Sequence, residues 1–598
     1  MPTNPAETPT RRMLWASING RSDASDKSLS TANNKILVSW RMFPEDDPQQ
    51  GFDLYRSCNG VETKLNEAPI CGSTNYQDAS ADRSKENTYR LCYAGSETTL
   101  DSYTLSVERS KNGLPYLSIP LHPTLSLGNT LVYRANDAAI GDLDGDGVDE
   151  IVVKRPYEVT VTDEDDNSLA APTEIRHTTL FEAYRLDGSF LWRVCSGPNI
   201  QLGNSSSFAV CDFDGDGRCE VAMRTAEGTI FADGKEIGDV NKDGKTDYRV
   251  GSKVHGGPEF LSVIDGMTGR ELARTDYIPL GKSEDWGDDY YKRSSSFRIG
   301  AGSFDGIGMS ILICRGCYGK IVLEAWNYKG GALTRLWNFD TTKGYKAYEA
   351  QGYHNLRVAD VDGDGYDEVV YGSCAIDHDG KGLYSTGLGH GDALHLGEFD
   401  RAHNGLETWG CYETGEAGAS LRDARTGREL WRYNDKADVG RAMIADIDPT
   451  NPGYEMWWYK GNAQSTSGAD LGYKPASCNM AVWWSGKLTR ELLNGTAIDA
   501  SPATGSVRYF TVYRYEVSSI NGSKENPSFV GDFLGDWREE VIYPTSDNKE
   551  LRIFSTWYPT EHKFPYLMSD HLYKMCVITQ NIGYNQPNHL GYYLGADK

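Results

Sequence analysis

Short runs of alternating apolar and polar residues, separated by glycine-rich turns, fill most of the chain. Near its start such runs occupy residues 36–41, 51–56 and 88–93. A period of two predicts β-strands with one face toward a core. An early-strand tryptophan followed by a tyrosine-rich late strand is typical of a fibronectin type III sandwich. We predict a small fibronectin type III-like β module over residues 15–110, after a disordered leader over 1–14. A strand-rich extension of the next domain is the alternative.

The rest of the chain, residues 111–598, repeats one unit: an apolar strand, an acidic glycine loop and a second apolar strand. Complete loops begin at Asp142, Asp212 and Asp360, and decayed copies occupy residues 301–311, 397–407, 445–456 and 531–541. The spacing of roughly 60–70 residues accommodates the four short strands of a propeller blade. The pattern predicts an all-β protein in which a β-propeller of seven or eight blades follows the small module, and we favour eight blades. A solenoid is the alternative, but no capping repeats are visible at the ends.

Four acidic loops, one of them in an insertion, place oxygen side chains at their first, third, fifth and ninth positions. These are Asp142, Asp144, Asp146 and Glu150; Asp212, Asp214, Asp216 and Glu220; Asp239, Asn241, Asp243 and Asp247; and Asp360, Asp362, Asp364 and Glu368. A glycine at the sixth position permits a sharp turn, and oxygen-only ligands of high charge suit Ca²⁺. We therefore expect structural calcium sites within the blades. A solvated acidic turn is the alternative.

Charge and hydropathy exclude two classes of partner. The chain has 60 Lys and Arg against 85 Asp and Glu, a formal net charge of −25. Nucleic-acid binders need a basic surface, so no nucleic-acid partner is expected. No apolar run approaches the roughly 20 residues of a membrane span. No secretory signal is visible at the start, which indicates either a cytosolic protein or numbering from a processed start.

Two further motifs have structural explanations. Cys314 and Cys317 have the C-x-x-C spacing, but no second pair lies nearby, which favours buried thiols or a local disulfide over a zinc or redox site. The tryptophan pairs at 457–458 and 483–484 are interpreted as blade core, with sugar stacking as the alternative.

A different group of ligand types lies around the segment at 387–395, Gly-Leu-Gly-His-Gly-Asp-Ala-Leu-His. His390 and Asp392 lie within it, His354 lies upstream and Glu413 downstream. Mixed imidazole and carboxylate side chains are consistent with a divalent ion near a reactive centre. Histidines that hydrogen-bond loop carbonyls are the alternative.

Four features together resemble the rhamnogalacturonan lyases of polysaccharide lyase family 11. They are the calcium-loop repeat, this segment, residues 535–541 and residues 584–587 (Tyr-Asn-Gln-Pro). The resemblance runs from about Tyr116 to the C-terminus and includes the N-terminal module. It implies an eight-bladed propeller with several Ca²⁺ ions, one of them at the active site. It also implies β-elimination at the Rha-α-1,4-GalA bond of rhamnogalacturonan I, an anionic pectic polysaccharide, which leaves an unsaturated galacturonate end. Members are exported, so we expect a secreted, periplasmic or cell-surface monomer.

The resemblance also implies site residues. The site metal would be held by His354, His390, Asp392 and Glu413, in agreement with the group above. The resemblance also places Arg441, Lys524 and Tyr584 in the catalytic cleft. From the chemistry that a uronate demands, we predict Lys524 as the base that removes the C5 proton, and Arg441 and the site Ca²⁺ as the groups that neutralise the carboxylate. Tyr584 would then protonate the leaving oxygen or share the base role. The remaining implied residues face the substrate: Asn136, Asp137, Asn521, Gly522 and Ser523.

The chain departs from the family pattern at two places. Many relatives follow the first acidic loop with Lys-Trp-Asp, whereas residues 154–158 here are Lys-Arg-Pro-Tyr-Glu and an acidic insertion follows through Asp166. Residues 255–258 are His-Gly-Gly-Pro where relatives commonly have Ser-Gly-Pro. The first departure predicts an altered subsite.

Two other functions are compatible with the sequence. A calcium-loop propeller can bind glycan or protein without catalysis, since fold alone does not define function. The abundant carboxylates also permit a pectin glycoside hydrolase. His354, His390, Asp392, Arg441 and Lys524 favour the lyase, because a scaffold has no need of them. A cation or an arginine beside the uronate carboxylate stabilises an enolate-like transition state, and Arg441 and the site Ca²⁺ are the candidates for that role.

Overall fold

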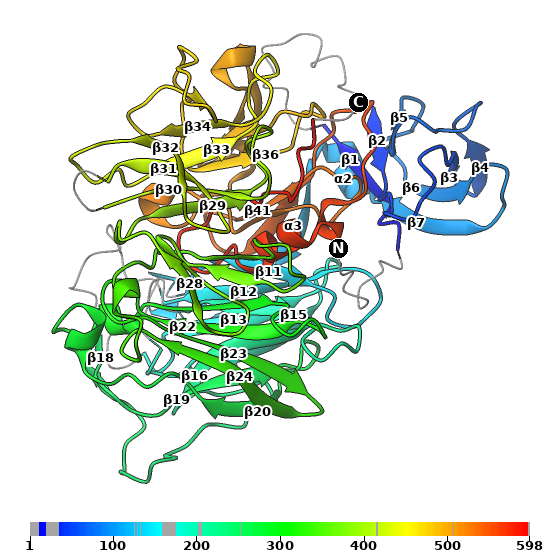
Figure 1. The fold of residues 1–598 in the computed structure, drawn as a ribbon. Coiled ribbons are helices and arrows are strands. Elements are labelled where there is room, and N and C mark those ends of the chain that lie inside the picture. Colours follow the sequence, from blue (N-terminus) through cyan, green and yellow to red (C-terminus); the bar gives the residue numbers. More distant parts are fainter. Residues whose placement is uncertain are drawn as a thin grey trace.

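The structure is a computed structural model that describes residues 11–19, 35–124, 126–127, 130–131, 133–157, 175–200, 206–251, 253–413, 417–505 and 507–595. The described chain is almost entirely β-structure, as predicted. In Figure 1 the first hundred residues (blue) form a separate body beside a larger assembly of sheets, which carries the rest of the chain. Among the described residues, no helix has the length and apolarity that a membrane crossing requires.

The N-terminal module is a sandwich of two antiparallel sheets. One sheet contains β1 (Trp15–Ile18), β2 (Ile36–Ser39) and β5 (Asn75–Asp78); the other contains β4 (Val61–Lys64), β3 (Phe52–Cys58), β6 (Asn87–Tyr93) and β7 (Thr99–Leu105). Alternate side chains of both sheets meet in one apolar core, in which Trp40, Phe52, Leu54 and Tyr89 are fully buried. This is the two-sheet arrangement that the alternating pattern predicted.

The predicted leader is shorter than expected. Residues 1–10 lie outside the described residues, but residues 11–14 are packed. Arg12 is only 4% exposed and pairs with Asp46, while Met13 and Leu14 are buried. The Met13 carbonyl accepts a hydrogen bond from Gly535 N at 3.1 Å. The burial of two apolar side chains explains why residues 11–14 belong to the folded structure, so the predicted leader is wrong for these four residues.

Eight antiparallel sheets follow one another in the described residues beyond the module. The first four contain β11 (Ala138–Gly141), β12 (Glu150–Pro156), β13 (Thr179–Tyr184) and β14 (Phe190–Cys195); β15 (Phe208–Cys211), β16 (Glu220–Ala226), β19 (Glu259–Ile264) and β20 (Glu271–Asp276); β21 (Phe297–Gly302), β22 (Ser310–Arg315), β23 (Val322–Lys329) and β24 (Ala332–Asp340); and β25 (Arg357–Ala359), β26 (Glu368–Val370), β27 (Cys374–Ile376) and β28 (Gly382–Ser385).

The other four sheets contain β29 (Ala393–Gly397), β30 (Glu407–Cys411), β31 (Ala419–Asp423) and β32 (Glu429–Tyr433); β33 (Ala442–Ala445), β34 (Glu455–Trp458) and β35 (Gln464–Ser465); β36 (Met480–Val482), β37 (Glu491–Asn494), β38 (Ala497–Asp499) and β39 (Arg508–Thr511); and β40 (Phe529–Gly531), β41 (Glu540–Pro544) and β42 (Glu550–Phe554) with β8 (Tyr116–Pro120). These eight sheets are the blades of the predicted propeller. Since β8 pairs with β42, a strand from before the first blade completes the last.

The remaining elements are short. Two hairpins are formed by β9 (Ser126–Leu127) with β10 (Thr130–Leu131) and by β17 (Arg249–Val250) with β18 (Lys253–Val254). Helix α2 (Val107–Asn112) joins the module to β8. The 3-10 helices are η1 (Ser283–Trp286), η2 (Arg293–Ser295), η3 (Lys346–Tyr348), η4 (Pro502–Thr504), η5 (Val512–Tyr515), η6 (Gly522–Lys524) and η7 (Leu567–Ser569).

The C-terminal segment runs through the middle of the ring. Helix α3 (His571–Ile578) contacts β11, β15, β21 and β25, the first strands of the first four blades, and lies centrally in Figure 1. Polar side chains beyond it, including Asn585, Asn588 and His589, are buried to 1% exposure or less. The segment thereby brings Tyr584 toward the same centre.

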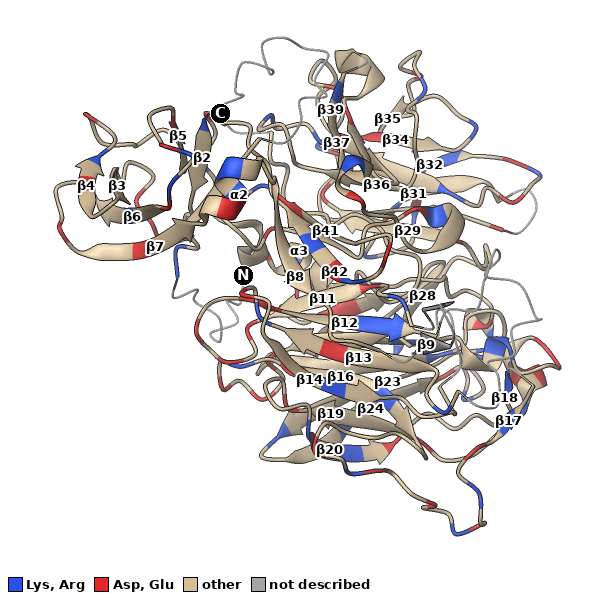
Figure 2. Ribbon diagram, turned by 180° about the vertical axis from the view of Figure 1, so that it is seen from behind, with Lys and Arg blue, Asp and Glu red and all other residues tan. Residues whose placement is uncertain are grey.

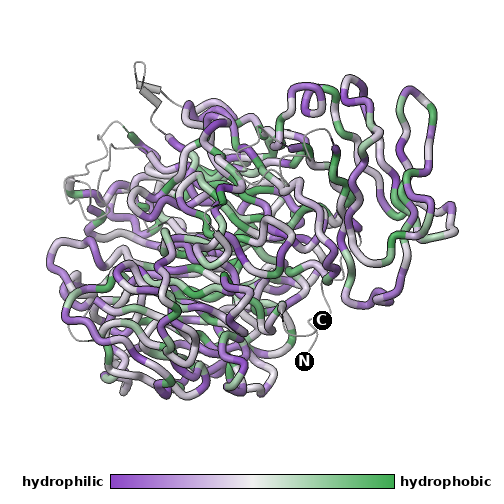
Figure 3. Tube along the Cα trace, turned by 90° about the horizontal axis from the view of Figure 1, so that it is seen from above, coloured by the Kyte–Doolittle hydropathy of each residue, from purple (hydrophilic) through white to green (hydrophobic). Residues whose placement is uncertain are grey.

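Apolar positions gather inside the blades and polar ones line the loops, as Figure 3 shows along the chain. Trp457, Trp458, Trp483 and Trp484 are at most 5% exposed, which confirms the interpretation as blade core. Cys314 and Cys317 are fully buried and form no disulfide. Both signs of charge are scattered over the ribbon in Figure 2.

Candidate active centre

Three of the acidic loops fold as compact ligand groups. Three side-chain oxygens come within 4.8 Å of one another in each: Asp142, Asp144 and Asp146; Asp212, Asp214 and Glu220; and Asp360, Asp362 and Glu368. The ninth-position glutamate of each loop accepts a backbone hydrogen bond from the second residue, at 2.8–2.9 Å. Burial raises the pKa of Glu150 and Glu220 to about 8 and that of Glu368 to about 9. Buried carboxyl groups with raised pKa values are expected to bind either a proton or a cation.

The fourth loop, at 239–247, differs from the prediction. Its ninth residue, Asp247, turns outward and pairs with Arg249 at 2.6 Å, and its side chain is 46% exposed. The fully buried Glu227 instead accepts the backbone hydrogen bond of Val240 at 2.6 Å. An aspartate side chain is one methylene shorter than glutamate, and this loop lies in the long connection between β16 and β19 rather than between the first two strands of a blade. A residue outside the nine-residue pattern therefore closes it.

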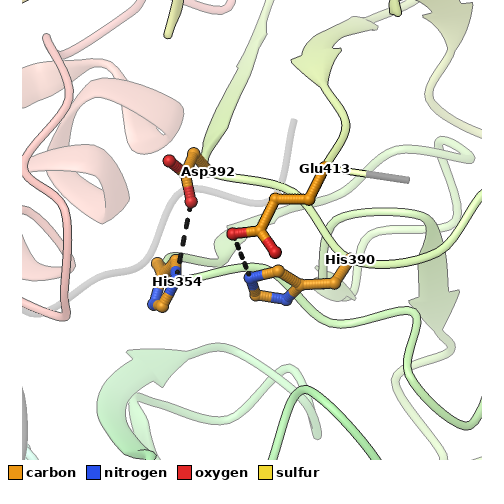
Figure 4. A group of neighbouring side chains, drawn as sticks. All are labelled: His354, His390, Asp392 and Glu413. Atoms are coloured by element: carbon orange, nitrogen blue, oxygen red, sulfur yellow. Dashed lines mark ion pairs between the residues drawn. The ribbon is translucent and has the colours of Figure 1, made fainter. Parts of the chain in front are cut away.

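The second ligand group brings together residues that are far apart in sequence. Figure 4 shows His354, His390, Asp392 and Glu413 turned toward one another, and their ligand atoms lie within 4.8 Å. His354 Nε2 lies 3.5 Å from Asp392 Oδ1, and His390 Nε2 lies 3.6 Å from Glu413 Oε1. The prediction that these four side chains share one place is thus matched by the geometry.

Several properties of this group fit a divalent cation. Burial lowers the pKa of His354 well below its usual range and that of His390 to about 3, so both rings are neutral and can donate a lone pair. His390 Nδ1 contacts the Gly352 carbonyl at 2.5 Å, which orients Nε2 into the group. The buried atoms His390 Nε2 and Asp392 Oδ1 have no hydrogen-bond partner within the part of the chain that the structure describes. Buried orphan atoms of this kind are expected to meet an ion or water.

The proposed catalytic side chains adjoin this group. Lys524 Nζ lies 3.7 Å from Asp392 Oδ2 and 4.0 Å from the centre of the Tyr584 ring. The Tyr584 ring stacks on His354 at 4.2 Å between centroids. Arg441 contacts Asn479 Oδ1 at 3.3 Å, and its buried Nη1 has no hydrogen-bond partner. Burial lowers the pKa of Arg441, and the nearby Asp392 carboxylate opposes that effect.

The predicted substrate-facing residues divide into two sets. Gly522 and Ser523 are exposed beside Lys524, in η6. Asn136, Asp137 and Asn521 instead hydrogen-bond to one another, and Asp137 is only 2% exposed. Asp137 is therefore enclosed by protein.

One residue that the sequence patterns did not indicate is Tyr318. Its hydroxyl hydrogen-bonds His354 Nε2 at 2.9 Å, and its ring lies 3.9 Å from that of His390. The Arg293 guanidinium lies over the same ring at 3.9 Å. Tyr318 comes from a loop between β22 and β23, outside every motif considered, so only its three-dimensional position reveals it.

Comparisons with known proteins agree with this geometry. The family model described as Rhamnogalacturonan lyase family 11, C-terminal domain, matches residues 115–598. A second, Rhamnogalacturonan I lyases beta-sheet domain, matches residues 27–105. The chain belongs to rhamnogalacturonan lyase family 11. It is a rhamnogalacturonan lyase, a pectin-degrading polysaccharide lyase.

Two curated relatives of the lyase come from Bacillus subtilis (strain 168). Rhamnogalacturonan endolyase YesW is 42% identical over 570 residues, 94% of this chain and 88% of the relative. Rhamnogalacturonan exolyase YesX is 40% identical over 583 residues, 94% and 93% of the two chains. The solved Bacillus licheniformis Rhamnogalacturonan Lyase PL11 superposes with a TM-score of 0.87 at 41% identity, covering 98% of this chain and 97% of that one.

At the first sequence departure, the lyase keeps its charged side chains inside the protein. Lys154 pairs with Asp137 at 2.7 Å, and Arg155 pairs with Glu182 at 2.9 Å. The acidic insertion through Asp166 lies outside the described residues. At the second departure, His255 stacks on Tyr291 with ring centroids 4.0 Å apart. The altered subsite stays a prediction.

Proposed function

We propose that the lyase cleaves the Rha-α-1,4-GalA bond of rhamnogalacturonan I by β-elimination. The observation that carries this proposal is the convergence of Lys524, Tyr584 and the orphan Nη1 of Arg441 around Asp392. A uronate needs a cation for its carboxylate, a base for its C5 proton and a donor for its leaving oxygen. These three groups supply one function each.

In this reaction Arg441 Nη1 binds the uronate carboxylate and so favours the negative charge that develops on loss of the C5 proton. Lys524 Nζ takes that proton. The bond between C4 and the glycosidic oxygen then breaks and a C4–C5 double bond forms. The leaving oxygen departs with the rhamnose and takes a proton from the Tyr584 hydroxyl. Arg293 adds positive charge beside the centre and favours a polyanionic chain despite the acidic net charge of the protein.

We further propose metal sites of two kinds. The three acidic loops hold structural Ca²⁺, since they present only hard oxygen ligands. His354, His390, Asp392 and Glu413 would hold a divalent cation whose charge, when bound, stabilises the uronate carboxylate. The two orphan atoms of this group support its role as a ligand set.

The test is product analysis with purified rhamnogalacturonan I. We expect near-ultraviolet absorbance to rise, and we expect products one water lighter in mass than hydrolysis would give. Saturated products would identify a hydrolase, and an unaltered polymer would favour a binding module. Product lengths during the time course distinguish the endolytic from the exolytic mode.

A further inference from the structure

Asp137 lies at the centre of a buried hydrogen-bond network. Its Oδ1 accepts hydrogen bonds from Asn521 Nδ2 at 3.1 Å and from Asn585 Nδ2 at 2.8 Å. Its Oδ2 pairs with Lys154 Nζ at 2.7 Å. With 2% of its surface exposed, Asp137 uses both oxygens within the protein. Its carboxylate is thus turned away from any sugar and toward these three partners.

The network connects the two chain segments that carry the proposed proton-transfer residues, Lys524 and Tyr584. Asn521 begins the base loop, defined here as residues 521–525, which carries Lys524. Asn585 directly follows Tyr584 in the C-terminal segment. Asp137 itself lies just before β11, and Lys154 lies in β12 of the same blade. One carboxylate therefore fixes the base loop and the Tyr584 segment to the first blade.

The base loop has a backbone that needs such support. Asn521, Gly522 and Glu525 have φ values of 61°, 53° and 48°. Left-handed conformations are unfavourable for residues other than glycine and persist when their surroundings hold them. Asn136 Nδ2 also donates to Asn521 Oδ1 at 3.0 Å, so both ends of the Asn521 amide are held. Without these bonds the loop is expected to relax and to move Lys524.

Asp137 must be a carboxylate because three donors converge on its side chain. A carboxylate can accept the two amides and the ammonium at once, whereas a neutral amide in the same place cannot serve all three. The side chains of Lys154 and Asp137 are 4% and 2% exposed, so each charge depends on the other. We propose that Asp137, paired with Lys154, is a positioning residue that holds Lys524 and Tyr584 in register for proton transfer.

This role rests on the proposed function and is tested in the full-length enzyme with Asp137→Asn. We expect kcat to fall about 100-fold, the cost of a misplacement of about 1 Å, while KM changes less than about threefold. The matched control is Glu182→Gln. It breaks the neighbouring buried pair with Arg155 on β12, and Glu182 contacts no residue of the base loop among the described hydrogen bonds. The control is expected to lower the melting temperature but to keep kcat within about threefold.

A double variant separates positioning from simple stability. Asp137→Leu with Lys154→Met removes both buried charges together with the acceptor at position 137, so its melting temperature should exceed that of Asp137→Leu alone. The kcat should stay low, because the base loop still lacks its acceptor. A kcat that recovers with the melting temperature, or one that falls no further than in Glu182→Gln, overturns the positioning role. The wild-type product is examined first: a saturated product overturns the proposed function, whereas an unsaturated product with an active Asp137→Asn enzyme overturns only the inference.

Discussion

The acidic loops and the His354 group are both clusters of side chains that could hold a metal ion, but they are assembled differently. Each loop draws its ligands from nine consecutive residues, and its aspartates lie at the edge of a blade. The His354 group draws on three separate segments and leaves two buried atoms without partners. A site that is complete within one turn can stabilise that turn alone. A site that needs several blades, with orphan atoms inside, is arranged for a ligand and for chemistry.

The decayed loops sharpen this contrast. Glu407, Glu455 and Glu540 of these copies accept the same kind of backbone hydrogen bond as the complete loops, although the aspartates around them are largely replaced. Glu491 does so at the equivalent place in the seventh blade, where no copy was recognised in the sequence. In the fifth blade, His403 contacts Glu407 at 2.6 Å and Asp423 at 3.0 Å, so an imidazole lies beside this glutamate in place of the loop aspartates. The glutamate therefore stabilises the turn of the blade through its backbone hydrogen bond whether or not the loop aspartates are present.

The largest expected effect is that of Lys524→Ala. General acid–base catalysis contributes about 10²–10⁴-fold, so kcat should fall by at least about 100-fold. The melting temperature should change little, because Lys524 belongs to the active centre and not to a blade loop. Absorbance of unsaturated product measures kcat, and thermal unfolding measures stability. Lys320→Ala, which removes another lysine lying over an aromatic ring, is the control. Retained activity in Lys524→Ala would assign the base to Tyr584.

Substitution of one ligand side chain at each kind of site tests whether the two kinds have separate roles. His390→Gln should lower kcat about 100-fold through loss of the ligand that faces Glu413, and loss of its ion should also lower the melting temperature. Asp144→Asn should lower the melting temperature as well, but kcat should stay within about twofold. Elemental analysis of both proteins should find one bound ion fewer. Equal effects of both variants on kcat and stability would contradict the separation.

Removal of calcium is expected to have a smaller effect that depends on pH. A site filled at 100 times its Kd contributes about 2.7 kcal/mol, so chelation should lower the melting temperature by several degrees. In the metal-free fold the raised pKa values of Glu150, Glu220 and Glu368 mean that stability is highest at low pH and is lost as pH rises through about 8–9. The loss on chelation should thus be larger at pH 8.5 than at pH 6. Calorimetry at both pH values checks this, and equal losses would contradict it.

Local patterns in the sequence were sufficient for the blades and for the three loops at Asp142, Asp212 and Asp360. Strand alternation and a nine-residue turn depend on neighbours in the chain, so their geometry follows from nearby residues. Residue 247 shows the limit of such patterns. The spacing is kept there, but the surrounding insertion supplies Glu227 in its place.

Only the tertiary structure decided what surrounds the reacting groups. The family resemblance grouped His354 with Asp392 at one metal site, but the contact of Asp392 with Lys524 and the stacking of His354 on Tyr584 came only from the structure. Asp137 finds its amide partners 384 and 448 positions later in the chain, and no local pattern relates such distant residues. Because the ring brings its first blade, its last loop and its C-terminal segment to one centre, a residue's role there depends on the closure of the fold.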